Sequence, residues 1–453
     1  MMIHDVVVIG GGIVGAGIFR DLALHGVNVL LLEKGDFSSQ TSQGSSKMLH
    51  GGIRYLETFD FALVQEALEE KNLWLKIAPH LTIEKEFHLP VYQGTKWPLF
   101  MVRLGLFLYD ALSHFHNRPS GQTDQALTLQ RFPQLKTNGL TGAGTYHDGI
   151  VDDHKLALEC IYHGEEESQA RAINYQEVLS IERGAINTIT YRDILTGKTQ
   201  QVQTRFVVFA TGPFTDELMQ RWNIPWEPVL LPSKGIHLWI KSDALNLHGP
   251  LVLPAQDGRV VFVIPQRHAI LVGTTETEVK EEMFNIKATP EDVSYLLGVL
   301  GDYFPTANVT QAQVISTFAA VRPLVREQGS TNRGKTSRHH RVFRPSENMY
   351  ALLGGKYTTF RRMAQDVCKE ITPRLGIPYN NALTLNHLRR PSAVGTFSNT
   401  SVSSEKIEQI IKTENVRTME DLVHRRLSWQ KDWQEYPEIA GHPLSYWQAR
   451  LPK

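Results

Sequence analysis

The chain has 453 residues, more than one hydrophobic core usually supports, and this length predicts two or three domains. Lysine plus arginine and aspartate plus glutamate both number 47, so the net charge is zero, which argues against a protein that binds nucleic acid through bulk positive charge. The hydrophobic fraction of 42% is ordinary for a globular chain, and the sequence contains neither a basic leader nor an apolar run long enough to span a bilayer.

The first residues show the pattern of a dinucleotide-binding unit. The predicted elements are a strand over residues 5–9, a helix over 13–24 and a second strand over 27–32. Gly10, Gly12 and Gly15 form a G-x-G-x-x-G motif at the first strand–helix turn, and Glu33 ends the second strand. An acidic residue at about this distance from the motif accepts a hydrogen bond from a ribose hydroxyl. The combination predicts dinucleotide binding, which the glycine motif alone would not establish.

The next segments are a polar loop, a helix and an apolar stretch. Residues 35–46 are small and polar, and their position after Glu33 favours a loop that covers the cofactor over a flexible linker. Residues 61–77 have the periodicity of an amphipathic helix. Residues 97–115 are strongly apolar but interrupted by charges, so they predict either a helix with aromatic anchors at a membrane interface or a buried core helix.

The middle and the end of the chain carry more strands. Strands are predicted over residues 206–210, 235–240, 259–265, 269–275 and 349–353, and a helix over 358–371. Cys160 and Cys368 belong to no Cys/His cluster, so no metal site is predicted, and both are expected to be buried free thiols.

The order of these elements predicts a fold class of α/β plus antiparallel β. We expect a discontinuous Rossmann-like domain over residues 1–80, 145–215 and 325–385. We expect a β-rich substrate or cap domain over residues 81–144 and 216–324, with the possible membrane-facing segment. Residues 386–453 are expected to form a linker, over about 386–402, and a small helical C-terminal region.

The segment over residues 47–57 is the most informative one for chemistry. It places His50, Arg54 and Tyr55 close together, with Gly51 and Gly52 allowing backbone to approach a ligand closely. A base, a cation and a phenol near a bound dinucleotide predict redox chemistry on a small anionic substrate.

Several separated segments resemble the FAD-dependent glycerol-3-phosphate dehydrogenase family, of the aerobic, quinone-linked type. They are the segments at residues 5–15, 41–57, 146–153, 210–213, 234–237, 272–275, 321–324 and 354–361, with a weaker match at 416–426. The resemblance implies oxidation of sn-glycerol 3-phosphate to dihydroxyacetone phosphate with non-covalent FAD. It also implies which residues hold FAD: Gly10, Gly12, Gly15, Glu33, Ser45, Ser46, Thr211, Gly212, Gly354, Gly355 and Thr358.

The expected reaction then defines the substrate site. The secondary alcohol loses a proton to a base and a hydride to the flavin; His50 is the candidate base and His237 the competing one. A dianionic substrate requires cations, for which Arg54, Arg322 and Lys356 are the candidates, with Arg322 also placed to stabilise a developing alkoxide. Tyr55 and Thr275 are expected as neutral donors.

The chain departs from the family's usual pattern at Phe214, Gln266, Glu276 and Ala320, and its C-terminal region is short. The expected partners are a small phosphorylated alcohol, a membrane quinone as electron acceptor, a membrane surface and a second copy of the chain in a homodimer, but no nucleic acid. The expected location is the cytoplasm, at the inner face of the membrane. Two alternatives stay open: an oxidase on the same scaffold that uses oxygen, and a flavin-fold binding protein without turnover.

Overall fold

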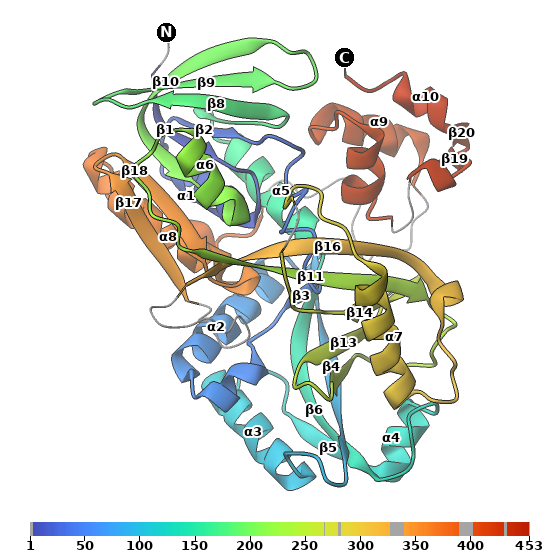
Figure 1. Ribbon diagram of the computed structural model, residues 1–453. Coiled ribbons are helices and arrows are strands. Elements are labelled where there is room, and N and C mark those ends of the chain that lie inside the picture. The colour runs from blue at the N-terminus through green and yellow to red at the C-terminus, as the bar shows by residue number, and fades with distance from the viewer. Residues whose placement is uncertain are drawn as a thin grey trace. The chain divides into compact units, whose positions relative to one another are not determined.

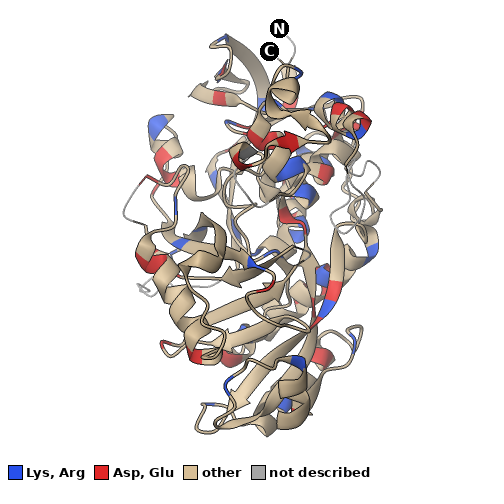
Figure 2. Cartoon of the chain, turned by 90° about the vertical axis from the view of Figure 1, so that its right-hand side faces the viewer, with Lys and Arg blue, Asp and Glu red and all other residues tan. Residues whose placement is uncertain are grey.

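The computed structural model describes residues 3–266, 268–279, 282–326, 339–388, 402–429 and 433–452. The chain forms two compact units. Unit 1 comprises Met1–Gln43, Asp152–Ser233 and Val321–Lys453, and unit 2 comprises Gly44–Val151 and Lys234–Ala320. Figure 2 shows basic residues interspersed with acidic ones along the chain.

Unit 1 is built on a largely parallel sheet (Figure 1). The strand order is β17-β18-β10-β1-β2-β7, and the β8–β9 hairpin joins through β10. The strands are β1 (Ile3–Ile9), β2 (Val29–Leu32), β7 (Ala170–Ile173), β8 (Gln176–Glu182), β9 (Asn187–Asp193), β10 (Thr199–Phe209), β17 (His340–Ser346) and β18 (Met349–Gly354). The helices are α1 (Ile13–Leu24), α5 (Asp153–Glu165), α6 (Thr215–Arg221) and α8 (Phe360–Arg374).

The core of unit 1 explains why its central strands are continuously apolar. Val7 and Ile9 point into a cluster with α6 and the β8–β9 hairpin. Val6 and Val8 alternate with them and are also fully buried, so β1 has no solvated face. Helix α1 packs against α5 and α8. The strand–helix–strand unit is therefore the predicted one, with helix bounds that coincide with the prediction.

Unit 2 is a mostly antiparallel sheet with the order β15-β11-β14-β13-β12-β4-β6-β3, to which β16 and β5 add through β11 and β6. The strands are β3 (Met48–Leu49), β4 (Thr82–Tyr92), β5 (Gly121–Asp124), β6 (Leu140–Val151), β11 (Leu230–Lys241), β12 (Leu251–Pro254), β13 (Val260–Pro265), β14 (Ala269–Gly273), β15 (Thr277–Glu278) and β16 (Val314–Val325). The helices are α2 (Phe61–Ile77), α3 (Leu99–Leu112), α4 (Gln125–Arg131) and α7 (Pro290–Tyr303). Helix α7 packs into one apolar cluster of this unit, and α2 and α3 into another. The antiparallel pairing of β11, β13 and β14 agrees with the prediction.

The last part of the chain folds as a small element with its own apolar cluster. It contains α9 (Ser404–Thr413), the π-helical turn η7 (Asp421–Arg426), η8 (Trp433–Glu435), β19 (Glu438–Ile439), β20 (His442–Pro443) and α10 (Leu444–Gln448). The predicted small helical C-terminal region therefore consists of short helices and one two-stranded sheet. Most of the predicted linker, residues 389–401, lies outside the described residues.

The division of the chain differs from the predicted one in five places. The shorter differences are residues 145–151, which fall in unit 2, and residues 216–233 and 321–324, which fall in unit 1. Residues 44–80 were expected in the nucleotide domain but belong to unit 2, because β3 pairs with β6 and α2 packs on the same apolar cluster. Residues 402–452 were expected to form a separate region but group with unit 1, which they contact through buried ion pairs described below. Both cysteines are buried and free, as expected.

Candidate active site

The residues predicted to hold the cofactor's phosphates and adenosine follow parallel strands of unit 1. Ile9 pairs in register with both Phe209 and Leu32, and Phe209 pairs with Ala351. Because the carboxyl ends of parallel strands meet at one edge of a sheet, the residues that follow these strands lie at that edge. They are Gly10 after β1, Glu33 after β2, Thr211 and Gly212 after β10, and Gly354 and Gly355 at the end of β18.

The glycine turn after β1 leaves no room for side chains. Gly10 has a φ of +106°, and a Cβ there would lie 2.5 Å from the carbonyl oxygen of Ala210. A Cβ at Gly15 would lie 1.8 Å from the carbonyl oxygen of Gly10. These approaches bring the N-terminus of α1 against the turn, where free amides and the helix dipole favour an anion such as a pyrophosphate. The Ser42 hydroxyl, which the motif reading did not single out, accepts from the Ile13 amide at 2.8 Å.

Glu33 is fixed by the same turn. Its two carboxylate oxygens accept from the amides of Gly11 at 2.6 Å and Gly35 at 2.7 Å. Burial raises the pKa of Glu33, and the two amides act in the opposite direction. A carboxylate held in this way presents its remaining lone pairs as acceptors, which suits the hydroxyls of a ribose.

The segment after β18 forms a second tight turn. Gly354 and Gly355 have φ values of +77° and +76°, and a Cβ at Gly355 would lie 2.4 Å from the sulfur of Met363 on α8. Lys356 and Thr358 follow and are buried. The Thr211 hydroxyl lies 2.8 Å from that of Thr215. A Cβ would fill the space that the glycines leave beside these turns. The turns therefore fit a dinucleotide that is held by backbone amides at the edge of the sheet.

Ser46 and His237 are brought together in unit 2. The Ser46 hydroxyl lies 2.9 Å from Nε2 of His237, whose ring stacks on Phe318 at a centroid distance of 4.9 Å. A Cβ at Gly273, which pairs with His237 across β11 and β14, would lie 2.1 Å from the imidazole. Thr275 is buried, and its hydroxyl accepts from the Ile236 amide at 3.1 Å. His237 is therefore a tightly packed histidine.

The His50 segment is supported from behind by a buried polar network. His50 follows β3, and a Cβ at the next residue, Gly51, would lie 2.4 Å from the hydroxyl of Tyr109 and 2.5 Å from Leu68. The Gly51 amide donates to Asp148 at 3.3 Å, and the Tyr109 hydroxyl contacts both oxygens of that carboxylate at 3.0 and 3.1 Å. The network fixes the backbone on which His50 is displayed.

The other candidates differ in exposure. Gly52, with a φ of +80°, begins the short helix η1 (Ile53–Thr58), which carries Arg54 exposed and Tyr55 partly exposed. Arg322 lies in the last part of β16, which belongs to unit 1 while the first part of the strand belongs to unit 2, and it is half-buried. Ser45 and Ser46 fall in unit 2, so they belong to a different unit from the other predicted cofactor residues.

The Asp148 carboxyl gives a pH-dependent prediction. Burial raises its pKa to about 6, above the value of about 3.9 for an unfolded aspartate. The folded state therefore holds this proton more tightly, and the group's contribution to stability falls as the pH rises from about 4 to about 6. We expect Asp148→Asn to gain roughly 2 kcal/mol in free energy of unfolding relative to wild type between pH 4 and pH 7.

The measurement is urea unfolding at several pH values, with Asp243→Asn at an exposed position as the matched control. Parallel pH curves for wild type and Asp148→Asn would show that Asp148 does not titrate in this range.

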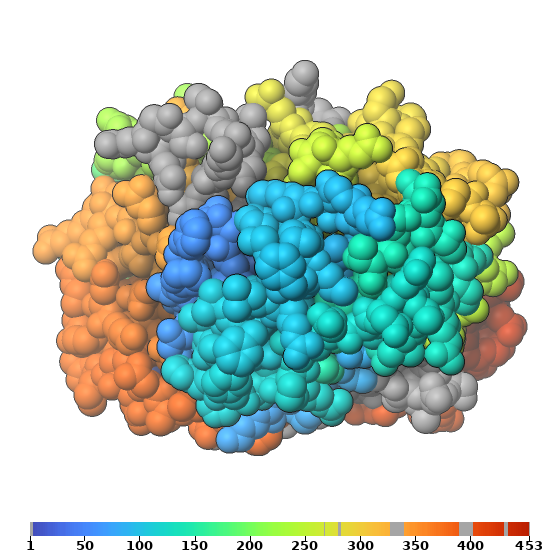
Figure 3. Space-filling view, turned by 90° about the horizontal axis from the view of Figure 1, so that it is seen from below, coloured from blue at the N-terminus to red at the C-terminus, as the bar shows by residue number. Residues whose placement is uncertain are grey.

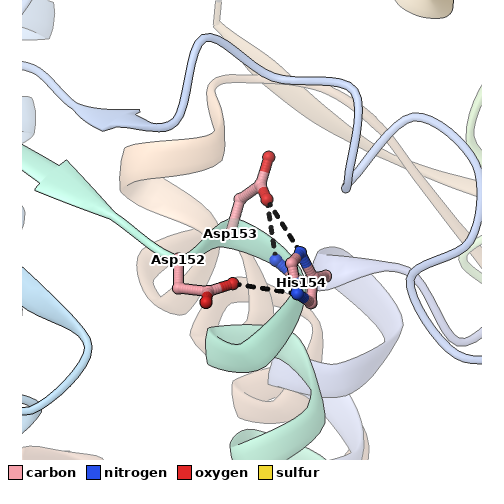
Figure 4. A group of neighbouring side chains, drawn as sticks. All are labelled: Asp152, Asp153 and His154. Carbon is pink, nitrogen blue, oxygen red and sulfur yellow. Dashed lines mark hydrogen bonds and ion pairs between the residues drawn. The ribbon is translucent and has the colours of Figure 1, made fainter. Parts of the chain in front are cut away.

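One further polar group lies outside this set. Asp152, Asp153 and His154 have the proximity of a metal site (Figure 4). His154 already lies 3.1 Å from Asp152 and 3.4 Å from Asp153, and the Ser428 hydroxyl donates to Asp152 at 2.8 Å. The Lys155 ammonium also lies 3.7 Å from Asp152. Because these side chains already bind one another, we interpret the group as a structural contact at the start of α5.

A largely parallel sheet with a glycine turn after its first strand and an acidic residue after its second defines a dinucleotide-binding protein. Residues 5–359 match the family described as FAD dependent oxidoreductase. The chain belongs to this family, and its cofactor is FAD.

Comparison with individual relatives specifies the sequence similarity further. The chain is 33% identical over 375 residues to the aerobic glycerol-3-phosphate dehydrogenase of Bacillus subtilis, a match that covers 82% of this chain and 67% of the relative. It is 34% identical over 330 residues to the alpha-glycerophosphate oxidase of Streptococcus pneumoniae, covering 71% of this chain and 54% of that protein. The chain therefore spans about two thirds of the first relative and about half of the second.

Solved structures agree with the fold. The glycerol-3-phosphate dehydrogenase of Bacillus halodurans, complexed with FAD, superposes with a TM-score of 0.69 at 26% identity, over 86% of this chain and 68% of that one. The L-alpha-glycerophosphate oxidase of Mycoplasma pneumoniae, with FAD bound, has a TM-score of 0.66 at 15% identity, over 85% of this chain and 99% of that one, and supports the fold alone.

Proposed function

We propose that the protein oxidises sn-glycerol 3-phosphate to dihydroxyacetone phosphate, with FAD as the oxidant. The observation that carries this proposal is the rigidly supported His50-Gly51-Gly52-Ile53-Arg54-Tyr55 segment, in a chain similar to proteins named glycerol-3-phosphate dehydrogenase and alpha-glycerophosphate oxidase. The segment offers a base, a cation and a phenol within six residues, which are the groups that a phosphorylated alcohol requires.

When bound, FAD supplies an acceptor for the hydride that leaves the alcohol carbon. In unit 1, the amides of the glycine turn and the carboxylate of Glu33 hold the pyrophosphate and the adenosine ribose. The turn at Gly354 and Gly355, together with Thr358, presents backbone donors to the rest of the cofactor.

His50 takes the hydroxyl proton of the alcohol in this proposal. A neutral imidazole is a suitable base near pH 7. His50 is half-buried, whereas His237 is only 2% exposed, so exposure favours His50.

The remaining candidates recognise charge. Arg54 and Lys356 provide cations for the phosphate, and Tyr55 and Thr275 provide hydroxyl groups. Arg322 stabilises negative charge on the substrate oxygen as its proton leaves.

The electron acceptor separates two candidate functions. We propose a quinone, as in an aerobic dehydrogenase; the oxidase reading rests on the 34% identity with alpha-glycerophosphate oxidases. The test is an assay of the FAD-loaded protein with glycerol 3-phosphate, first with a quinone analogue and then with oxygen alone. Fast quinone reduction with little peroxide supports the dehydrogenase, peroxide in stoichiometric yield supports the oxidase, and a protein that cannot be loaded with FAD would indicate a binding role without turnover.

We also propose that α3 attaches the protein peripherally to a membrane. Among the described residues, none of the helices combines the length and the apolar character needed to cross a bilayer. Helix α3 nevertheless exposes large apolar side chains, with Phe100 71%, Leu104 66% and Phe107 59% exposed. The light-blue to cyan region of Figure 3, which includes α3, lies at the surface. Of its residues only Leu106, Tyr109 and Asp110 are buried, so α3 is not the core helix that the sequence left as an alternative.

The apolar surface continues beyond α3. Phe59 and Phe115 are 77% and 62% exposed, and Phe115 contacts Phe107. Trp97 is partly exposed and is held by a hydrogen bond of 2.9 Å from its indole nitrogen to Glu57. Aromatic anchors around an amphipathic helix, with Arg103 exposed on the same helix, are typical of a segment that lies in the membrane interface.

Replacing Leu104 and Phe107 together by serine tests this attachment. Because both side chains are exposed, the fold should be retained, while the loss of two apolar anchors should reduce partitioning onto phosphatidylglycerol–phosphatidylcholine vesicles at least about tenfold. Vesicle co-sedimentation measures the effect, and Leu195→Ser, at an exposed apolar position in unit 1, is the control. Unchanged vesicle binding, or a change from dimer to monomer in light scattering instead, would move the role of α3 from lipid to a second copy of the chain.

A further inference from the structure

The C-terminal element contacts the cofactor-binding part of unit 1 through two adjacent arginines. Residues 402–452 lie beyond the stretch of 5–359 that matches the family. Their apolar cluster is their own. On η7, Arg425 and Arg426 are buried and reach the loop that follows β2.

Both arginines bind one carboxylate, that of Asp36. Arg425 donates from Nε to Oδ2 of Asp36 at 2.5 Å. Arg426 donates to both oxygens, with a distance of 3.0 Å from Nη2 to Oδ1. Arg425 also donates to Asp421 at 2.7 Å and to the exposed Glu420 at 3.3 Å. The side chain of Asp36 is 0% exposed.

Burying these charged side chains costs free energy, so their burial calls for a structural explanation. Burial opposes the ionisation of Asp36, but Arg426 and Arg425 outweigh it and hold its pKa below the ordinary value. Charges removed from water are seldom a net gain over well-packed apolar side chains, and their best-attested use is to fix one geometry. The question is which geometry Asp36 fixes.

Asp36 lies in the loop that carries the predicted ribose ligand. The loop begins at Glu33, whose carboxylate accepts from Gly11 and Gly35. Two residues after Asp36, the amide of Ser38 donates to the carbonyl of Gly11 at 2.9 Å. The loop is thus hydrogen-bonded to the glycine turn on both sides of Asp36, and Asp36 itself is held by the C-terminal element.

The arginines are in turn held in place. Arg426 donates from Nε and Nη2 to the carbonyl of Glu414 at 2.9 and 2.7 Å, and the Tyr162 hydroxyl donates to the same oxygen at 3.0 Å. The Asn174 side chain bridges Asp36 and the carbonyl of Asn415, at 2.9 and 2.8 Å. The contact between the C-terminal element and the loop after β2 is therefore held by several hydrogen bonds and does not depend on one exposed ion pair.

We propose that the C-terminal element is a clamp that sets the Glu33–Ser38 loop for FAD, with Arg425 and Arg426 as positioning residues. The proposal rests on the proposed role of Glu33 toward the adenosine ribose. It gives residues 402–452 a function in holding the cofactor, and it makes FAD affinity depend on side chains that do not touch FAD.

Lysine substitutions test the clamp, because they keep the charge and remove the two-pronged donor. The holoenzyme of Arg426→Lys and of Arg425→Lys is diluted, and FAD release is followed by the fluorescence of the free flavin. We expect release at least about fivefold faster than in wild type, the lower end of typical coupling between sites. Arg450→Lys is the matched control, since Arg450 belongs to the same element but pairs with Glu408 at the surface. At saturating FAD, the KM for glycerol 3-phosphate should not change.

A second measurement, on the wild-type protein, tests the clamp even if the lysine variants fail to fold. In the wild-type protein, coupling is reciprocal, so adding FAD to the apoprotein should slow hydrogen exchange at the amides of residues 421–427 as well as at Gly11 and Ser38. Normal FAD release in folded lysine variants, or no effect of FAD on exchange at residues 421–427, would overturn the clamp. Both readouts report FAD binding alone, so a protein that binds FAD but does not oxidise glycerol 3-phosphate would leave the clamp standing and reject only the proposed function.

Discussion

His50→Asn is expected to lower kcat for glycerol 3-phosphate by roughly 10²–10⁴, the usual contribution of a positioned general base. Asparagine retains a hydrogen-bonding side chain but cannot take up the hydroxyl proton. Because His50 stands on a backbone fixed through the Gly51 amide and Asp148, the variant should keep its fold and its FAD. The measurement is single-turnover reduction of bound FAD under anaerobic conditions, with the absorbance of FAD and thermal unfolding as checks.

Two other histidine variants make this result specific. His114→Asn, at an exposed position where the ring contacts Gln65, should leave turnover unchanged. His237→Asn should have a smaller effect through packing, since its ring is stacked on Phe318 and contacts Ser46. If His50→Asn turns over normally and His237→Asn does not, the base is His237.

Gly15→Ala is expected to abolish FAD binding. The added Cβ would lie 1.8 Å from the carbonyl oxygen of Gly10, a backbone atom that can move only if the turn opens. Opening the turn removes the amides that face the pyrophosphate and separates α1 from β1, so thermal stability should fall as well. The measurements are the FAD content of the purified protein and its unfolding temperature.

The matched control is Gly298→Ala on α7, where a Cβ meets nothing within 4 Å. Alanine in an open helical position should leave FAD content unchanged and raise stability by up to about 1 kcal/mol. Full FAD content in Gly15→Ala would contradict the assignment of this turn to the cofactor.

The sequence pattern predicted well those elements that depend only on residues close together in the chain. The bounds of α1 and α2 coincide with the predicted ranges because their apolar periodicity and flanking residues are unambiguous. The strand predicted over residues 206–210 is instead the end of β10 (Thr199–Phe209), because the polar first half of β10 gains its strand structure by pairing with β9. Pairing between strands is not visible in the pattern of one strand.

Features that depend on contacts between residues far apart in the chain could not be predicted from the sequence. Nothing near Arg425 and Arg426 indicates burial, and Asp36 lies 389 and 390 positions away. The assignment of residues 44–80 to unit 2 likewise depends on the pairing of Met48 and Leu49 with β6. The candidate cofactor residues could be predicted because a glycine motif after a strand implies a geometry, whereas Ser42 has no such signal.

One departure from the family pattern has a physical account. Ala320 stands where glycine is frequent, and it faces Gly44, at which a Cβ would lie 2.3 Å from the Cβ of Ala320. A glycine at position 44 thus accommodates the methyl group at position 320. Nothing in the structure explains Phe214, Gln266 or Glu276 in the same way.

The most direct test of the proposed function is the anaerobic absorbance spectrum of the FAD-loaded protein before and after addition of glycerol 3-phosphate. The account predicts that the visible absorbance band of the bound flavin bleaches at stoichiometric substrate, on the order of seconds or faster, while glycerol at the same concentration leaves it unchanged. A band that persists with glycerol 3-phosphate in excess, in protein shown to be loaded with FAD, would contradict the account.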